Sequence, residues 1–353
     1  SDLFFAYFKV FLLHLPLYSF PVFSFIKGGG GIGVQFFFVL SGFLITYIIL
    51  HEKIHTGRLN LKNFYIRRIL RIWPLYFLMV GFSFAAPIII RWLNVTHSDE
   101  GYEPRWYWSV FFVENYRMIL ENNHPNISPL TVMWSLCIEE HFYIVWGLLL
   151  FFVPVKHFPK IVIVCLITAV VSRVVFVLND WQTVDLFTNI DLFAFGGLLG
   201  YYLNTKPETA EKILHFPRRY KLLFILFMIT AVGLQHHIFS NKTGEVISPL
   251  IFGGLFTLLL AVFIPEKSRL KIPDRSFLSK WGKISYGLYL YHPIVINALI
   301  QVFAMLKWQR DDPVFAIIFS ITAFFLTVFI SHLSYILFEK PFLRLKKYFY
   351  RKD

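Results

Sequence analysis

Long apolar stretches separated by short polar segments run along almost the whole chain. A helix needs about 20 predominantly apolar residues to cross the hydrocarbon core of a bilayer. The pattern predicts ten such helices, over residues 3–22, 34–50, 73–93, 136–153, 161–178, 187–204, 222–239, 248–264, 284–306 and 314–337. We therefore expect an all-α fold, a polytopic membrane helical bundle of about ten transmembrane helices.

The composition supports a membrane protein and argues against a soluble domain. Of 353 residues, 57% are hydrophobic and only 16% are charged, whereas about a quarter of a typical soluble domain is charged. The first stretch lacks the basic start and the small-residue cleavage site of a signal peptide, so it is predicted to be a span. We expect one integral-membrane domain over residues 1–353, and the initial Ser indicates that a native N-terminal segment precedes it.

The positive charges lie in alternate connections. Twenty-five of the 34 lysines and arginines fall in 51–72, 154–160, 205–221, 265–283 and 338–353, and seven are scattered over the opposite set. Short loops rich in lysine and arginine stay in the cytoplasm, so the N and C termini are both predicted to be cytoplasmic. The net charge of +13 is then a topology signal that also suits anionic membrane lipids, and no nucleic-acid partner is expected.

One long connection, 94–133, lies on the predicted outer side. It combines carboxylates with tryptophan, tyrosine and asparagine, which suits a surface that stacks on sugars and hydrogen-bonds to them. A cap at head-group level, with Trp106 and Trp108 in the membrane interface, is an equally good interpretation.

Ionisable residues within the predicted spans are informative because each is costly in lipid. They are Lys9, His14, Glu139, Glu140, His141, Arg173, Asp191 and His292. Lys9 is near a span end and is expected to extend to the interface. Arg173 and Asp191, on neighbouring spans, are expected to pair with each other, and a catalytic role is the alternative. His14 is different, because a rise of 1.5 Å per residue from Leu3 places it roughly 16 Å deep, about half-way across the hydrocarbon.

Three arginines gather before the third predicted span, in the string FYIRRILRIWPLYF (64–77). Arg67 and Arg71 are four residues apart and share a helix face, and Arg68 lies beside them. The planar guanidinium suits phosphate oxygens, so these side chains are predicted to bind a phosphorylated donor at the cytoplasmic face. Ordinary anchoring of a cytoplasmic loop is the alternative interpretation.

Six strings occur along the chain in this order: IGVQFFFVLSGFLITYII (32–49), FYIRRILRIWPLYF (64–77), MWSLCIEEHFYIVW (133–146), DLFAFGGLLGYYL (191–203), WGKISYGLYLYHP (281–293) and LSYILFEKPFLRL (333–345). With the ten predicted spans, they make the chain closely resemble membrane-bound acyltransferase family 3. The resemblance implies a membrane O-acyltransferase of the kind that commonly O-acetylates cell-surface polysaccharides. A stand-alone form is expected, because no soluble esterase-like domain follows the tenth predicted span.

The resemblance also implies site residues. His14 matches the first-span histidine regarded as catalytic in the family, Arg67, Arg68 and Arg71 match its cytoplasmic arginine motif, and Trp134, Ser135 and Glu139 match its tryptophan-serine-glutamate motif. The expected donor is acetyl-CoA, and the expected acceptor is a hydroxyl of an extracytoplasmic glycan. His14 would act as general base or as nucleophile, with Glu139 fixing the imidazole tautomer or binding the acceptor. Trp134, Ser135 and His292 are candidates for substrate binding, and a purely structural role in the bundle is the alternative for His292.

Other assignments stay open. The rival class is an exporter of a glycan or a lipid-linked sugar, and a further alternative is an acyltransferase that uses succinyl-CoA or a longer acyl donor. No metal site is expected, because no set of His, Cys and carboxylate residues has ligand spacing. Gly42 is expected to pack helices, and Glu339 to form a structural ion pair. The expected partners are acyl-CoA, a carbohydrate acceptor and lipids of the bacterial plasma (inner) membrane, with the oligomeric state left open.

Overall fold

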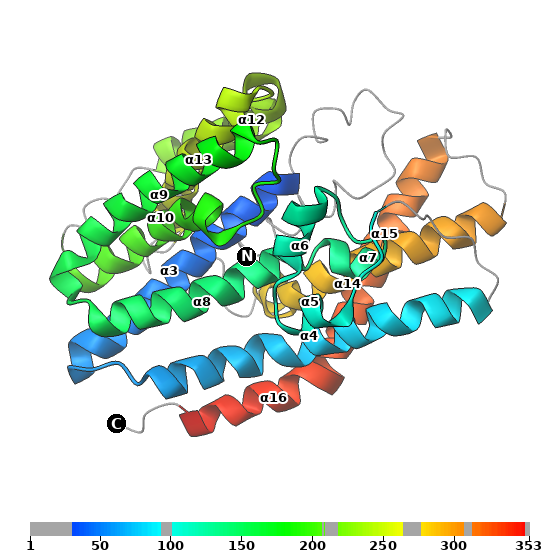
Figure 1. The fold of residues 1–353 in the computed structure, drawn as a ribbon, viewed down its shortest axis with the longest axis horizontal. Coiled ribbons are helices and arrows are strands. Elements are labelled where there is room, and N and C mark those ends of the chain that lie inside the picture. The colour runs from blue at the N-terminus through cyan, green and yellow to red at the C-terminus, as the bar shows by residue number, and fades with distance from the viewer. Residues whose placement is uncertain are drawn as a thin grey trace. The chain divides into compact units, whose positions relative to one another are not determined.

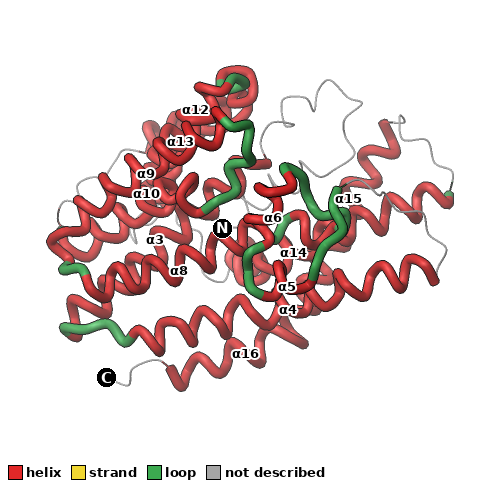
Figure 2. The backbone as a smooth tube through the Cα atoms, viewed as in Figure 1, coloured by secondary structure: helices red, strands yellow, loops and turns green. Residues whose placement is uncertain are grey.

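A computed structural model of the chain describes residues 30–92, 101–206, 208, 218–263, 277–306 and 313–349. Within these residues the chain is almost entirely helical, and its only β-type pairing is an isolated bridge between Tyr102 and Pro125 (Figures 1 and 2). The prediction of an all-α fold is confirmed.

Long helices alternate with short helical segments. The long helices are α3 (Gly30–Thr56), α4 (Leu61–Trp92), α8 (Trp134–Phe152), α9 (Phe158–Leu178), α10 (Leu186–Thr205), α12 (Arg218–Ile238), α13 (Lys242–Phe263), α14 (Phe277–Met305) and α15 (Pro313–Ser334). The short segments are α5 (Trp106–Val110), α6 (Glu114–Glu121), α7 (Ser128–Thr131), η1 (Val155–His157), η2 (Tyr335–Glu339), α16 (Lys340–Leu345) and η3 (Lys346–Phe349).

Nine helices in the described ranges are long and apolar enough to cross a membrane. They correspond to nine of the ten predicted spans, and the protein is an integral, multi-pass membrane protein. The remaining predicted span, 3–22, lies outside the described residues, and so do Lys9 and His14.

Helical structure extends well beyond the predicted spans at the start of α4 and after α15. α4 begins at Leu61, so the three arginines and Pro74 belong to one continuous helix. Proline is tolerated inside membrane helices because neighbouring groups satisfy the carbonyl that it leaves free. After α15 the chain continues through the π-helical turn η2, then α16 and the 3-10 turn η3, where the sequence predicted a tail.

The chain divides into two compact units. The first contains the described parts of 30–59 and 139–282, and the second contains those of 60–138 and 283–349. The prediction of one integral-membrane domain over 1–353 stays a prediction.

In the first unit, α10 packs against α3, α9 and α13 (Figure 1). α3 and α10 come close because glycines of each helix face the backbone of the other helix. A Cβ on Gly42 would collide with the carbonyl of Phe193, and a Cβ on Gly196 would collide with the carbonyl of Val39. Small residues commonly allow this approach between membrane helices. The packing role predicted for Gly42 is confirmed.

In the second unit, α4 packs against α5 and α7, and also against η2, α16 and η3. Hydrogen bonds from tyrosine hydroxyls also join elements of this unit. Tyr76 on α4 donates to the carbonyl of Ser109 at 2.6 Å, and Tyr286 on α14 donates to the carbonyl of Ile72 at 3.0 Å. Tyr291 donates to the hydroxyl of Ser334 at 2.9 Å, which joins α14 to the end of α15.

Candidate functional site

The predicted arginine motif lies near the start of α4 and meets the C-terminal segment of the second unit. Arg67 is buried, and its guanidinium donates to the backbone carbonyl of Phe349 at 2.7 Å. Arg68 and Arg71 are half-buried. The charges of all three arginines act on Lys346 of η3. We call Arg67, Arg68, Arg71 and Lys346 the cationic cluster.

The cationic cluster has the chemistry of an anion-binding site. Like charges in one place repel, so a cluster of this kind is stabilised by a bound anion. Guanidinium groups bind phosphate oxygens through paired N–H donors, and an ammonium adds a compact point charge. The sequence predicted the three arginines, but it treated Lys346 only as one of several positive charges in a tail.

Glu339, the last residue of η2, lies next to the cationic cluster. Its side chain is almost fully buried, and neither carboxylate oxygen has a hydrogen-bond partner among the described residues. The charge of Arg71 acts on it. The structural ion pair expected for Glu339 is therefore absent among the described residues, and only the more distant charge of Arg71 acts on the carboxylate.

A second group of predicted residues meets at the start of α8. The hydroxyls of Ser135 and Tyr289 lie 2.7 Å apart, and both lie within hydrogen-bond distance of the carbonyl of Val132, at 3.1 and 2.8 Å. The ring of His292, which is fully buried, lies 5.8 Å from the ring of Tyr289. The structure thus brings Ser135 and His292 to one tyrosine, with Trp134 half-buried beside them.

Sequence reasoning missed Tyr289. The available signal was its spacing, because Tyr289 precedes His292 by three residues and so shares a helix face with it.

The predicted pair of His14 and Glu139 is only partly described. Glu139 lies on α8 in the first unit and is half-buried. His14 lies outside the described residues. The interaction between the two therefore stays a prediction.

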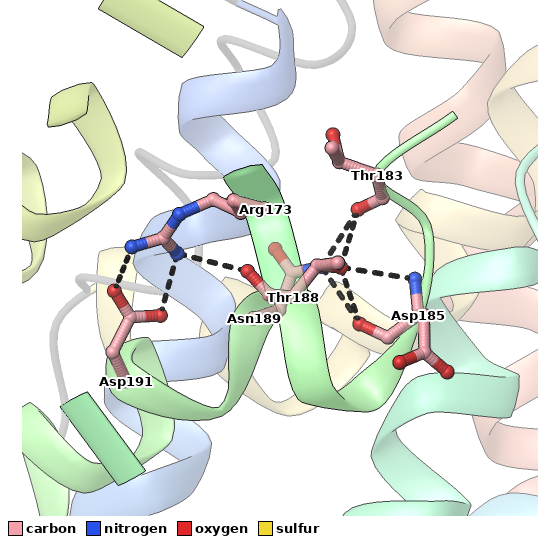
Figure 3. A network of polar contacts seen from close by, with 6 residues as sticks. All are labelled: Arg173, Thr183, Asp185, Thr188, Asn189 and Asp191. Carbon is pink, nitrogen blue, oxygen red and sulfur yellow. Dashed lines mark hydrogen bonds and ion pairs between the residues drawn. The ribbon is translucent and has the colours of Figure 1, made fainter. Parts of the chain in front are cut away.

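Arg173 and Asp191 form the pair that the sequence predicted (Figure 3). The guanidinium of Arg173 donates to both carboxylate oxygens of Asp191, at 2.9 and 2.7 Å, and also to the carbonyl of Thr188 at 2.8 Å. Both side chains are buried within the first unit. A bidentate, buried pair of this kind fixes α9 against α10.

The start of α10 continues this network (Figure 3). Asp185 caps the helix by accepting from the backbone N–H of Phe187 at 2.8 Å, and Thr188 completes a capping box. Asn189 donates to the carbonyls of Thr183 and Asp185, both at 2.9 Å. These polar side chains therefore satisfy backbone groups at a helix start inside the first unit.

The described part of the long outer connection is folded. Glu114 is fully buried and accepts hydrogen bonds from Tyr102 and Ser109, both at 2.7 Å. Burial and this hydrogen bond raise the pKa of Tyr102, so the phenol remains a donor. The guanidinium of Arg117 lies 4.3 Å from the centroid of the Tyr102 ring. Glu114 is thus a structural carboxylate of the loop.

Aromatic side chains of the same connection remain accessible. Trp106 is 60% exposed and Phe111 is 69% exposed. Tyr107 accepts a hydrogen bond from Arg105 at 3.0 Å, which lowers the pKa of its phenol. A sugar-stacking surface and an interfacial cap both remain compatible with these exposed rings.

No group of three or more His, Cys, Asp or Glu residues in the described ranges is arranged to hold a metal ion. The two cysteines, Cys137 and Cys165, are free and buried.

The sequence matches the Acyltransferase domain family over residues 4–335. The chain belongs to this acyltransferase family. The match includes every predicted site residue, from His14 to His292, and ends before Glu339 and Lys346.

Curated relatives of this acyltransferase include O-acetyltransferase OatA of Staphylococcus aureus strain NCTC 8325 and the same protein of strain MRSA252. Each is 28% identical over 333 residues, and the aligned region covers 89% of this chain and 52% of the relative. The chain therefore spans about half the length of these relatives. No solved structure gives a significant match to it.

Proposed function

We propose that this acyltransferase moves an acetyl group from acetyl-CoA, bound at the cytoplasmic face, to a hydroxyl group of a glycan on the other side of the membrane. The O-acetyltransferase names of the relatives support an oxygen acceptor and an acetyl group. Family membership alone does not specify the donor, the direction of transfer or the acceptor, and these are parts of the proposal.

The observation that carries this proposal is the cationic cluster. CoA has a pyrophosphate and a ribose phosphate, which are the groups that guanidinium forks and an ammonium bind best. The cluster gathers Arg67, Arg68 and Arg71 from α4 and Lys346 from η3. The alternating distribution of lysine and arginine assigns this end of α4 to the cytoplasm, where acyl-CoA is made.

The proposed chemistry is a direct acyl transfer. His14 removes the proton of the acceptor hydroxyl as its oxygen attacks the thioester carbonyl, and the tetrahedral intermediate collapses to the ester with loss of CoA thiolate. The imidazolium then returns the proton to the thiolate. Glu139 is proposed to orient the imidazole and stabilise its charged form. Trp134, Ser135 and His292 are proposed to bind substrate.

The test uses purified protein in nanodiscs, acetyl-CoA labelled in its acetyl group, and candidate glycans. We expect CoA release matched by labelled glycan. His14→Ala should bind acetyl-CoA with near wild-type affinity and lose turnover by at least about 100-fold. An exporter would leave the thioester intact, which would contradict the proposal. Substantial turnover by well-folded His14→Ala would contradict the role of His14.

A further inference from the structure

Two buried polar groups of the second unit have no use in the acyl-transfer scheme above. Glu339 is 3% exposed, and Ser331 is fully buried. Neither the carboxylate oxygens of Glu339 nor the hydroxyl of Ser331 has a hydrogen-bond partner in the part of the chain that the structure describes. A buried carboxylate without a hydrogen-bond partner is strongly unfavourable, and a donor group of a bound ligand would satisfy it.

Both groups face one point on α14. A Cβ placed on Gly287 would lie 3.3 Å from the Cβ of Ser331 and 3.4 Å from Oε1 of Glu339. The carboxylate therefore lies in a close contact between α14 and the end of α15, which fixes where it points.

The backbone of η2 is the second feature that sets Glu339 apart. Residues Tyr335–Glu339 form a π-helical turn, which is rare and is found frequently at functional sites. The hydrogen bond from Tyr291 to Ser334 holds the residue before this turn against α14. Glu339 therefore lies in an irregular turn whose start is held against α14.

Glu339 and the cationic cluster both belong to the region where the C-terminal segment packs against α4. Arg71 acts on both Glu339 and Lys346, whereas Arg67 and Arg68 act on Lys346. η2, α16 and η3 each pack against α4, and Arg67 near the start of α4 donates to the carbonyl of Phe349 at the end of η3. The carboxylate of Glu339 and the cations of the cluster are therefore carried by α4 and by neighbouring elements that pack against it.

We propose that Glu339 determines donor specificity by accepting a hydrogen bond from an amide N–H of the pantetheine arm of CoA, while the cationic cluster binds the phosphates. This inference rests on the proposed donor site. Phosphates at pH 7 accept hydrogen bonds, whereas the arm carries amide N–H groups and a hydroxyl that donate them. The cations and the carboxylate lie on neighbouring elements, and the phosphates and the arm are likewise neighbouring parts of one CoA molecule.

The experiment compares two ligands in nanodiscs by calorimetry: CoA, and adenosine 3′,5′-bisphosphate, which lacks the arm. Glu339→Leu should weaken CoA binding on the order of tenfold or more, and Glu339→Gln should weaken it less because an amide oxygen still accepts. Binding of adenosine 3′,5′-bisphosphate should stay the same or tighten. Lys346→Met should weaken both ligands, and Glu121→Gln, which removes an exposed carboxylate of α6, should weaken neither.

Stability provides a second readout. Because Leu replaces a buried carboxylate that has no hydrogen-bond partner among the described residues, ligand-free Glu339→Leu should melt at a higher temperature than wild type. A lower melting temperature with equal loss of both ligands would make Glu339 a structural residue and overturn the inference. If Glu339→Leu binds CoA as tightly as wild type does, the inference about Glu339 is also overturned. That result would not contradict the proposed function. Absence of CoA binding by wild type would overturn the proposed function itself.

Discussion

Two regions of the protein, one in each unit, treat buried charge in opposite ways. In the first unit, Arg173 is joined to Asp191 by two hydrogen bonds, and glycines bring α3 and α10 into contact. In the second unit, the cationic cluster gathers like charges, and the carboxylate of Glu339 has no hydrogen-bond partner within the described residues. Buried charge that is paired within the protein serves packing, whereas the carboxylate of Glu339, which has no hydrogen-bond partner among the described residues, is the basis for proposing a ligand.

The largest expected effect is on the paired charges. Asp191→Ala leaves the guanidinium of Arg173 buried without its carboxylate, which should cost about 3–5 kcal/mol of unfolding free energy. Thermal unfolding in detergent would measure this loss. The double variant Arg173→Met/Asp191→Leu should recover most of it, because no buried charge remains. A single variant as stable as wild type would show that the pair is not needed for packing.

The glycine contact should come next. Gly196→Ala places a methyl group against the backbone of α3, which cannot move aside as a side chain would, so we expect a loss of about 3 kcal/mol. Gly81→Ala is the matched control, because a Cβ at that helix position meets nothing within 4 Å. It should be neutral or slightly stabilising. Equal melting temperatures for the two variants would contradict the close approach of α3 and α10.

In the second unit, we expect a substitution in the cationic cluster to change ligand affinity rather than stability. Arg71→Ala should weaken acetyl-CoA binding by about 1.5–3 kcal/mol, or roughly tenfold to more than 100-fold, with little change in melting temperature. Arg71→Lys should restore only part of the affinity, since an ammonium lacks the paired donors of the guanidinium. Arg344→Ala, an exposed residue of α16, is the control and should bind normally. Unchanged affinity in Arg71→Ala would favour the alternative interpretation, in which the arginines only anchor a loop at the membrane.

The smallest effect is expected in the outer connection. Tyr102→Phe removes one of the two donors to buried Glu114 and should cost about 1 kcal/mol. The pKa of Tyr102 is raised in the folded protein, so its contribution should be complete below the ordinary value of 10.0 and lost as the pH rises through the folded value. Unfolding measured at several pH values would test this. A loss of stability near pH 7 would indicate that a group other than Tyr102 titrates there.

Much of this architecture was predictable from the sequence. Long apolar runs predicted the nine described spans, because length and hydropathy decide which helices can cross a bilayer. The pairing of Arg173 with Asp191 was predictable because two opposite charges in neighbouring spans have few other partners. The three arginines of α4 were recognised from their spacing in one helix turn.

The C-terminal part of the site was not predictable in the same way. Residues 338–349 contain no long apolar run, and their helical form depends on packing against α4. The hydrogen bond from Arg67 to Phe349 joins residues 282 positions apart, which no local pattern indicates. The missing partner of Glu339 is also a tertiary property, because a sequence shows a carboxylate but not its surroundings.

The π-helical turn of Tyr335–Glu339 makes chain length itself part of the site. Each residue of a helix turns the chain by about 100°, so deleting one residue within 335–338 would rotate everything that follows by that angle. Lys346 and Phe349 would then leave their positions beside α4 although no side chain of the cluster had changed. A single-residue gap in this segment should therefore be tolerated less well than most substitutions there, and the spacing of its residues is a more sensitive property than their identity.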